Sequence, residues 1–229
     1  MLRTRLTSRV LLAAAAAVVT AVLAQAQDEG RHPVSGRFYA NTMSAAGAPW
    51  LDRDEREDEE APKKAIGLLG LKAGDVVADV GAGSGYFTLK MAELVGPSGR
   101  VYASDIQQEM LDIIAVKLRG TALTNVTLVL GDDDDPKLPP GTIDMALMVD
   151  VYHELHQPQA VLKRIRAALK QDGRLVLLEY RAEDPKVPIQ TLHKMSIATA
   201  KQEVEHEGFV LSEVKHDLPW QHLLVFTKK

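Results

Sequence analysis

The chain has 229 residues, of which 46% are hydrophobic and 25% charged, and its formal net charge is −4. This length and composition fit one globular domain with a short leader. The absence of cysteine excludes disulfides, thiolate zinc sites, iron–sulfur chemistry and a cysteine nucleophile.

The first 26 residues have the pattern of a signal peptide. Three arginines, Arg3, Arg5 and Arg9, precede the apolar run 10–24, which ends in an Ala-Gln-Ala cleavage pattern. The run is shorter than the roughly 20 residues that cross a bilayer, so we expect a periplasmic or secreted protein without stable membrane insertion after cleavage. The alternatives are an uncleaved anchor, or a misassigned start site that extends a cytoplasmic protein.

Cleavage after residue 26 removes three arginines and no acid, which takes the formal charge from −4 to −7. A domain this acidic lacks the electrostatic footprint of a general nucleic-acid binder. We therefore expect no nucleic-acid partner.

Residues 27–61 are predicted to form an N-terminal arm or lid. The first part of this segment is polar, with little apolar periodicity, yet it carries several large side chains: Phe38, Tyr39, Met43 and Trp50. These residues either close over a ligand site or only anchor the arm to the core. The acidic run 52–60 is expected to be solvated helix surface.

Residues 62–229 alternate between predicted strands and helices, which indicates an α/β domain with a parallel sheet. The strands are predicted at 76–80, 100–105, 126–130, 143–149, 174–180, 209–215 and 222–227. The helices are predicted at 86–95, 109–118, 158–169 and within 192–206, with a glycine stop at 170–173.

An apolar strand runs into the glycines Gly81, Gly83 and Gly85. Glycines let the backbone turn sharply and approach a ligand, and the helix that follows begins with unpaired N–H groups. The spacing differs from the Gly-x-Gly-x-x-Gly of dinucleotide sites. Asp79 precedes the turn, and Asp105 ends the next strand.

These features resemble the class I S-adenosylmethionine-dependent methyltransferases, over roughly residues 74–229. The resemblance implies a Rossmann-like three-layer sandwich with a mostly parallel seven-stranded sheet, whose last strand inserts antiparallel between two others. It also implies S-adenosylmethionine as cofactor and a small-molecule methyl acceptor.

The resemblance assigns cofactor roles to residues at the strand ends. Asp79 and the turn Gly81, Ala82, Gly83 and Gly85 would face the methionine part. Asp105 would hold the ribose hydroxyls, Ile106 would cover the adenine, and Asp132 would meet the adenine amino group. Strand-end position alone adds further candidates for the cofactor pocket: Gly131, Asp133 and Asp150.

The segment 150–156 follows the fourth strand. It lacks the Asn/Asp-Pro-Pro-aromatic run found in methyltransferases that act on adenine or glutamine amide nitrogens. His153 is the candidate general base, because histidine titrates near neutral pH, and Tyr152 and Glu154 would support it or line the pocket. A local capping role for His153 is the alternative.

We expect no metal site. The His-Glu-Leu-His sequence at 153–156 is not the zincin spacing, and the aspartates 132–135 lack the glycine and the distal glutamate of an EF-hand loop.

The segment after the fifth strand supplies candidate substrate-binding residues: Glu179, Arg181, His193 and Lys194. The three basic side chains are placed to receive an anionic substrate group, or else to cap helices and pair with nearby acids.

A second hypothesis for the whole chain is a non-catalytic S-adenosylmethionine-binding protein of the cell envelope. A third is an NAD-dependent oxidoreductase, which fits Asp105 but not the glycine spacing. The oligomeric state is not predicted.

Overall fold

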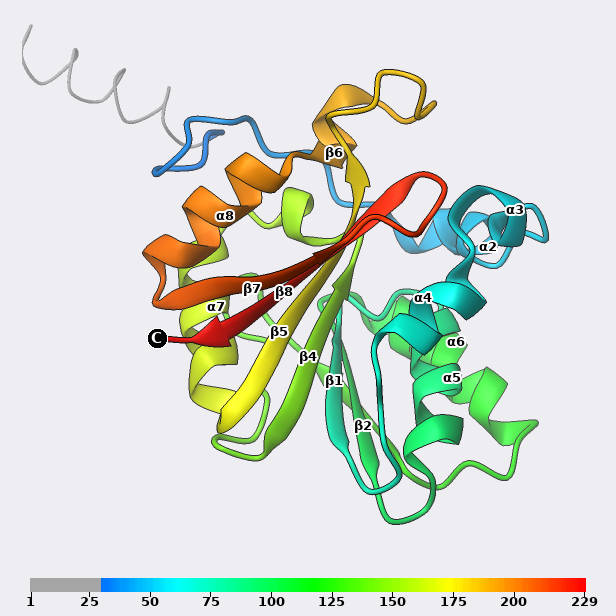
Figure 1. Ribbon diagram of the computed structural model, residues 1–229. Coiled ribbons are helices and arrows are strands. Elements are labelled where there is room, and N and C mark those ends of the chain that lie inside the picture. The colour runs from blue at the N-terminus through cyan, green and yellow to red at the C-terminus, as the bar shows by residue number, and fades with distance from the viewer. Residues whose placement is uncertain (1–29) are drawn as a thin grey trace, which may run out of the picture.

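The computed structural model describes residues 30–229, so the predicted leader lies outside the described residues. A twisted sheet with the strand order β3-β2-β1-β4-β5-β8-β7 runs through the domain (Figure 1). Its strands are β1 (Val76–Val80), β2 (Arg100–Asp105), β3 (Val126–Leu130), β4 (Ile143–Val149), β5 (Leu169–Arg181), β7 (Phe209–Lys215) and β8 (Gln221–Lys228).

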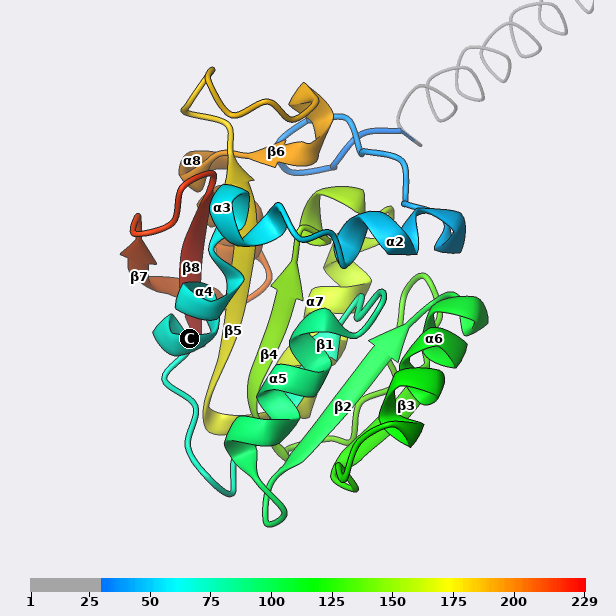
Figure 2. The same cartoon turned by 90° about the vertical axis from the view of Figure 1, so that its right-hand side faces the viewer.

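Helices cover both faces of this sheet and complete three layers (Figures 1 and 2). α4 (Pro62–Leu68), α5 (Tyr86–Val95) and α6 (Gln108–Arg119) lie on one face, and α7 (Pro158–Ala168) and α8 (Ile197–His206) lie on the other. Neighbouring residues of β4 alternate between the two cores: Met145 packs on the α4 and α5 side, and Ala146 on the α7 and α8 side. The three-layer α/β prediction is confirmed.

The predicted antiparallel insertion of the last strand is also confirmed. β8 pairs antiparallel with both β5 and β7 and lies between them. An eighth strand, β6 (Lys194–Met195), is only two residues long and adds parallel to the end of β5. It extends the predicted seven-stranded sheet at the edge above the carboxyl ends of the strands.

The expected glycine stop at 170–173 is wrong in detail, because β5 begins at Leu169 directly after α7. The ladder with β4 skips from Leu169 to Arg174, so the residues between them bulge out of register. A Cβ on Gly173 would lie 2.8 Å from the Ile143 carbonyl oxygen, which explains why glycine occupies this close approach.

The chain leaves β1 on one side and returns at β4 on the other, so the topological switch lies between β1 and β4. Ligands of doubly wound sheets bind at the carboxyl ends of the strands at this point. Among residues 30–229, no helix has both the length and the apolar character needed to cross a bilayer.

The arm lies across the carboxyl ends of the strands and contains η1 (Ala45–Gly47), α2 (Ala48–Leu51) and α3 (Arg56–Glu60) (Figure 2). It is anchored by Arg37, whose Nε donates to the buried Glu203 of α8 at 2.9 Å. The remaining short elements are η2 (Tyr152–Glu154) and η3 (Thr191–His193), which follow β4 and β5.

Candidate functional site

A cavity of about 720 Å³ lies between the carboxyl ends of the strands and the arm. This volume is within the range of about 300–1,000 Å³ that is typical of small-molecule sites. The arm supplies part of the wall through Thr42, Met43, Trp50 and Leu51. It therefore both anchors itself to α8 and borders the cavity.

The glycine turn forms the floor at β1. Gly81, Gly83 and Gly85 all have positive φ, at 72°, 53° and 80°, which favours glycine at each position. A Cβ would also collide with neighbours, at 2.5 Å from Val151 for Gly81 and 2.8 Å from Leu51 for Gly83. Gly81 and Gly83 line the cavity, whereas Ala82 and Gly85 do not and instead support the turn.

Asp105 braces this turn from β2. Its Oδ2 accepts a hydrogen bond from the Gly83 backbone at 2.9 Å, and its Oδ1 accepts one from the Gln107 backbone at 2.9 Å. Burial raises the pKa of the Asp105 carboxyl, although these N–H donors act in the opposite direction. The carboxylate lines the cavity with Ile106, so its predicted position at the strand end is confirmed.

The Gln107 side chain joins Asp105's loop to the arm. Its amide nitrogen donates to the Met43 carbonyl at 2.9 Å, and its amide oxygen accepts from the Ala45 backbone at 3.0 Å. No feature of the sequence singled out this residue, apart from its place directly behind the strand-end acid.

Asp79 does not line the cavity and lies under the turn, fully buried. Thr88 Oγ1 donates to its Oδ2 at 2.6 Å. Burial raises the pKa of the Asp79 carboxyl to about 6. The expectation that it faces the cofactor directly is corrected: the strand turns its side chain toward α5 instead.

Asp150 is strained at the end of β4, with a φ of 55° that few non-glycine residues adopt. Its Oδ2 accepts from Gln221 at 2.7 Å, but its buried Oδ1 has no hydrogen-bond partner in the structure. Burial, together with the charges of Glu60 and Glu179, raises the pKa of this carboxyl well above its ordinary value. Asp150 lines the cavity, so a ligand bound there can donate a hydrogen bond to its Oδ1.

Directly after β3, Gly131, Asp132 and Asp133 complete the cavity wall near Asp105. Asp132 is exposed and pairs with Lys137 at 2.9 Å.

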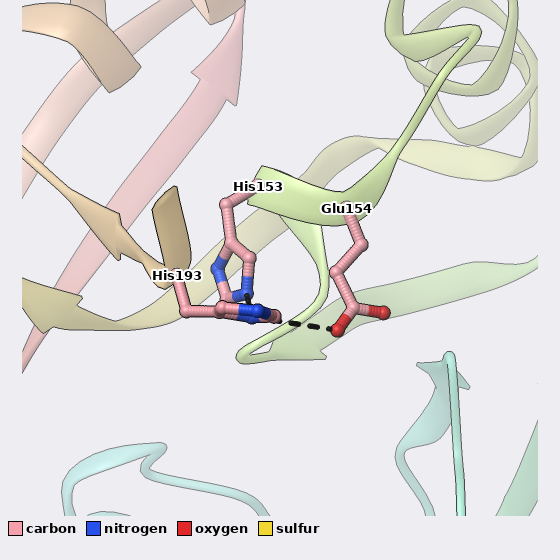
Figure 3. Close-up of side chains that lie close together, drawn as sticks. All are labelled: His153, Glu154 and His193. Carbon is pink, nitrogen blue, oxygen red and sulfur yellow. Dashed lines mark hydrogen bonds and ion pairs between the residues drawn. The ribbon is translucent and has the colours of Figure 1, made fainter. Parts of the chain in front are cut away.

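At the opposite end, His153, Glu154 and His193 project toward one another (Figure 3). His153 Nδ1 lies 2.6 Å from Glu179 Oε2, and its Nε2 lies 3.2 Å from His193 Nδ1. His193 Nδ1 lies 3.8 Å from Glu154 Oε1. Both ring nitrogens of His153 therefore have partners, which the prediction of a single general base did not anticipate.

Burial governs ionisation at this cluster. It raises the pKa of the Glu154 carboxyl to about 7. It lowers the pKa of His193, and the neighbouring His153 acts in the same direction.

Four predicted residues lie behind the wall rather than in it. Tyr152 is buried away from the cavity, and Glu179 sits behind His153, where its Oε1 also accepts from the Tyr152 backbone at 2.9 Å. The expectation that Arg181 and Lys194 line the substrate site differs from their positions in the structure. Arg181 donates to the carbonyls of the 218–221 loop, and Lys194 donates to the Val187 carbonyl, so neither reaches the cavity.

The expectation that the acidic run 52–60 is solvated helix surface holds for Asp54, Glu55 and Asp58, which are exposed, but is wrong for two other residues. Arg56 and Glu60 are buried, with Arg56 Nε 2.5 Å from Glu60 Oε2, and Tyr180 donates to Glu60 Oε1 at 2.7 Å. Arg56 and Tyr180 line the cavity. The i,i+4 spacing of Arg56 and Glu60 was the available signal, but it also describes an exposed helix pair.

The sequence around this site is similar to those of known methyltransferases. Residues 77–173 match a family model described as "Methyltransferase domain". The ubiquinone/menaquinone biosynthesis C-methyltransferase UbiE of Pasteurella multocida is 31% identical over 135 residues, or 58% of this chain and 50% of the relative. The demethylmenaquinone methyltransferase of Lactobacillus johnsonii is 35% identical over 118 residues, or 51% of this chain and 48% of the relative. The chain thus spans about half the length of these curated relatives.

Among solved structures, an S-adenosylmethionine-dependent methyltransferase from Aquifex aeolicus aligns with a TM-score of 0.75 and 25% identity. The alignment covers 81% of this chain and 98% of that one. The residues that match the family model include both the glycine turn and Asp105. These similarities support a class I methyltransferase with S-adenosylmethionine as its cosubstrate.

Proposed function

We propose that this protein transfers a methyl group from S-adenosylmethionine to a small-molecule acceptor bound in the same cavity. The observation that carries the proposal is one continuous cavity with Asp105 and the glycine turn at one end and the cluster His153, Glu154 and His193 at the other. The first end fits a nucleoside, and the second offers groups that can orient an acceptor and handle its proton.

The cofactor end fits S-adenosylmethionine by charge and shape. Asp105 keeps carboxylate lone pairs for two ribose hydroxyls beyond the two N–H bonds that it already accepts. The unpartnered Oδ1 of Asp150 supplies a site for the methionine ammonium group. Gly81 and Gly83 leave room for the methionine chain, and Ile106 offers an apolar face for the adenine.

The cosubstrate supplies an electrophilic methyl group, so the protein has three tasks: to hold the acceptor in line, to exclude water and to accept any proton that the acceptor loses. The arm serves the second task through Met43 and Leu51. The cluster can accept the proton, because the buried carboxylate of Glu179, 2.6 Å from His153 Nδ1, holds the His153 ring in place. Asp132 and Asp133 lie near the place proposed for the adenine. Because both side chains are exposed, the backbone around Gly131 would share the recognition of the adenine amino group with them.

The acceptor is proposed to be a small molecule because the cavity is covered by the arm. The acidic chain offers no broad basic surface for nucleic acid. We further propose export, from the signal-peptide pattern of residues 1–26.

The proposal is tested first by calorimetry with S-adenosylmethionine and with its demethylated product. Binding at saturating ligand should raise the melting temperature by mass action, by an amount equivalent to about 2.7 kcal/mol at 100 times Kd. Absence of heat with either ligand would refute the cofactor assignment.

Turnover is tested separately, with methyl-labelled cosubstrate and small-molecule extracts. Label transfer establishes the enzyme. Binding without label transfer to any fraction would favour the alternative, a non-catalytic S-adenosylmethionine-binding protein of the cell envelope. Mass spectrometry of protein purified from its own compartment would report whether residues 1–26 have been removed.

A further inference from the structure

The cluster at the acceptor end brings together three groups with the donor atoms of a metal site. His153 Nε2, His193 Nδ1 and a Glu154 carboxylate oxygen all lie within 4.8 Å of one another (Figure 3). Zinc–nitrogen distances of about 2.0–2.1 Å place tetrahedral ligand atoms about 3–3.5 Å apart. The two histidine nitrogens are 3.2 Å apart, so they already have that separation.

The cluster is assembled from two separate segments that the fold holds firmly. His153 and Glu154 belong to η2 after β4, and His193 belongs to η3 after β5. Arg37 of the arm donates to the carbonyl oxygens of Tyr152 and His153, at 3.3 and 3.0 Å, which fixes the η2 backbone. Such a site needs no large rearrangement to close on an ion.

Glu179 provides the outer support that metal-bound histidines usually have. Its Oε2 lies 2.6 Å from His153 Nδ1, so the proton on that ring resides at Nδ1 and the Nε2 lone pair points into the cluster. Glu179 is fully buried, and its other oxygen is held by the Tyr152 backbone. The carboxylate therefore fixes both the orientation and the tautomer of the histidine.

A hydrogen bond between the two histidines explains less of this arrangement than a bound ion would. One proton shared between His153 Nε2 and His193 Nδ1 does not involve the Glu154 carboxylate, whose side chain is 13% exposed and which approaches His193 Nδ1 to 3.8 Å. A divalent cation would accept both nitrogen lone pairs and neutralise the carboxylate at once.

We propose that His153, Glu154 and His193 bind a divalent transition-metal ion at the acceptor end of the cavity. Two histidines and one carboxylate form a ligand set that leaves at least one coordination position open. Because all three residues line the cavity, the open position faces the space for the acceptor. This proposal departs from the expectation, drawn from the sequence, that the chain has no metal site.

The site specifies a class of acceptor, and this part rests on the proposed function. A hydroxyl, phenol or enol oxygen can occupy the open position, and the charge of the cation favours loss of its proton to solvent as it binds. With the ion bound, His153 is a ligand, so the ion takes over the task that His153 has as a base in the metal-free cluster. The acceptor is accordingly an oxygen-bearing small molecule that is held by its oxygen rather than by an anionic group.

The test is titration of the metal-free full-length protein with Zn²⁺ by calorimetry and with Co²⁺ by visible absorption. We expect one ion per chain and a Co²⁺ spectrum of low coordination number. The variants His153→Ala, His193→Ala and Glu154→Gln should each weaken binding by more than about tenfold, and Glu179→Gln should weaken it by about 10–100-fold through the histidine that it orients. His156→Ala is the matched control, because His156 borders the same cavity without joining the cluster, and its affinity should be unchanged.

Thermal unfolding and S-adenosylmethionine calorimetry on each variant check that the fold and the cofactor end are intact. Absence of Zn²⁺ and Co²⁺ binding, or binding that all four variants retain, would overturn the metal site. If the metal-free protein binds cosubstrate and transfers methyl groups at the full rate, the oxygen-acceptor inference fails while the proposed function stands. If metal binds and S-adenosylmethionine does not, the proposed function fails and the metal site stands.

Discussion

Replacement of Asp79 by asparagine should stabilise the protein at neutral pH and should flatten the dependence of its stability on pH. Asp79 is buried beneath the glycine turn, and burial raises the pKa of its carboxyl to about 6 from an ordinary value of 3.8. The Thr88 hydrogen bond and the more distant Arg56 oppose this shift, whereas the charge of Asp105 adds to it. Asparagine keeps an oxygen that can accept the Thr88 bond and carries no charge.

The sign follows from proton uptake. Between the two pKa values the folded protein binds the proton that the unfolded chain has released, so stability falls as pH rises through this window. The gap is about 2 pKa units at 1.36 kcal/mol each, which makes the ionised carboxylate cost about 3 kcal/mol above pH 6. The free energy of unfolding of Asp79→Asn, relative to wild type, should therefore increase by about 3 kcal/mol between pH 4 and pH 8.

Urea unfolding of the ligand-free protein at several pH values measures this difference. A stabilisation of this size corresponds to roughly 6–12 °C in melting temperature for a domain of about 200 residues. Asp172→Asn is the control, because Asp172 is an exposed aspartate on the bulge of β5. Parallel stability curves for Asp79→Asn and wild type would show that Asp79 does not titrate in this window, and the burial argument would fail.

The other predictions concern the cofactor end. Asp105→Ala should weaken S-adenosylmethionine binding by more than about tenfold in calorimetry, since charge-assisted hydrogen bonds contribute about 1.5–3 kcal/mol each, whereas the exposed Asp132→Ala should change affinity only a few-fold; equal losses would contradict the ribose assignment. Gly83→Ala should lower both stability and affinity, because its φ of 53° is strained for alanine and the new Cβ would press on the arm; an unchanged melting temperature would count against this. Gln107→Ala should speed proteolysis of the arm by releasing two side-chain hydrogen bonds, while Gln108→Ala, which loses only a bond on the exposed face of α6, should not; identical digestion rates would show that Gln107 does not hold the arm.

The glycine turn and the strand ends were predictable from the sequence because local chemistry determines them. Three glycines at alternate positions require a backbone that other residues resist, and the strand before them is apolar except for Asp79. The acid at the end of the next strand then lands at the same edge of the sheet, since carboxyl ends of parallel strands meet there. Asp105 beside Gly83 is the result.

The arm and the acceptor end were less predictable because their contacts join segments far apart in the chain. Arg56 and Glu60 have the composition of an exposed helix, and contacts with distant residues such as Tyr86 and Tyr180 bury them. His153 and His193 are 40 residues apart, and their meeting depends on how far the loop after β5 folds back over β4. Arg181 shows the converse: its charge and position suggested a substrate ligand, but the carbonyls of the nearby 218–221 loop take its donors.

The buried acids around the turn lower the stability of the ligand-free protein, and a cationic ligand can offset this loss of free energy. Asp79, Asp105 and Asp150 all have raised pKa values for the same reason, which is that burial penalises their charged forms. Evolution toward stability alone would remove such groups, since an uncharged residue of similar shape is cheaper to bury. Asp105 and Asp150 line the cavity and Asp79 lies beneath its floor, so the three acids suit a ligand with an ammonium and a sulfonium charge. The strained backbone of Asp150 places its side chain at the cavity, where a bound donor can satisfy the oxygen that has no partner among residues 30–229.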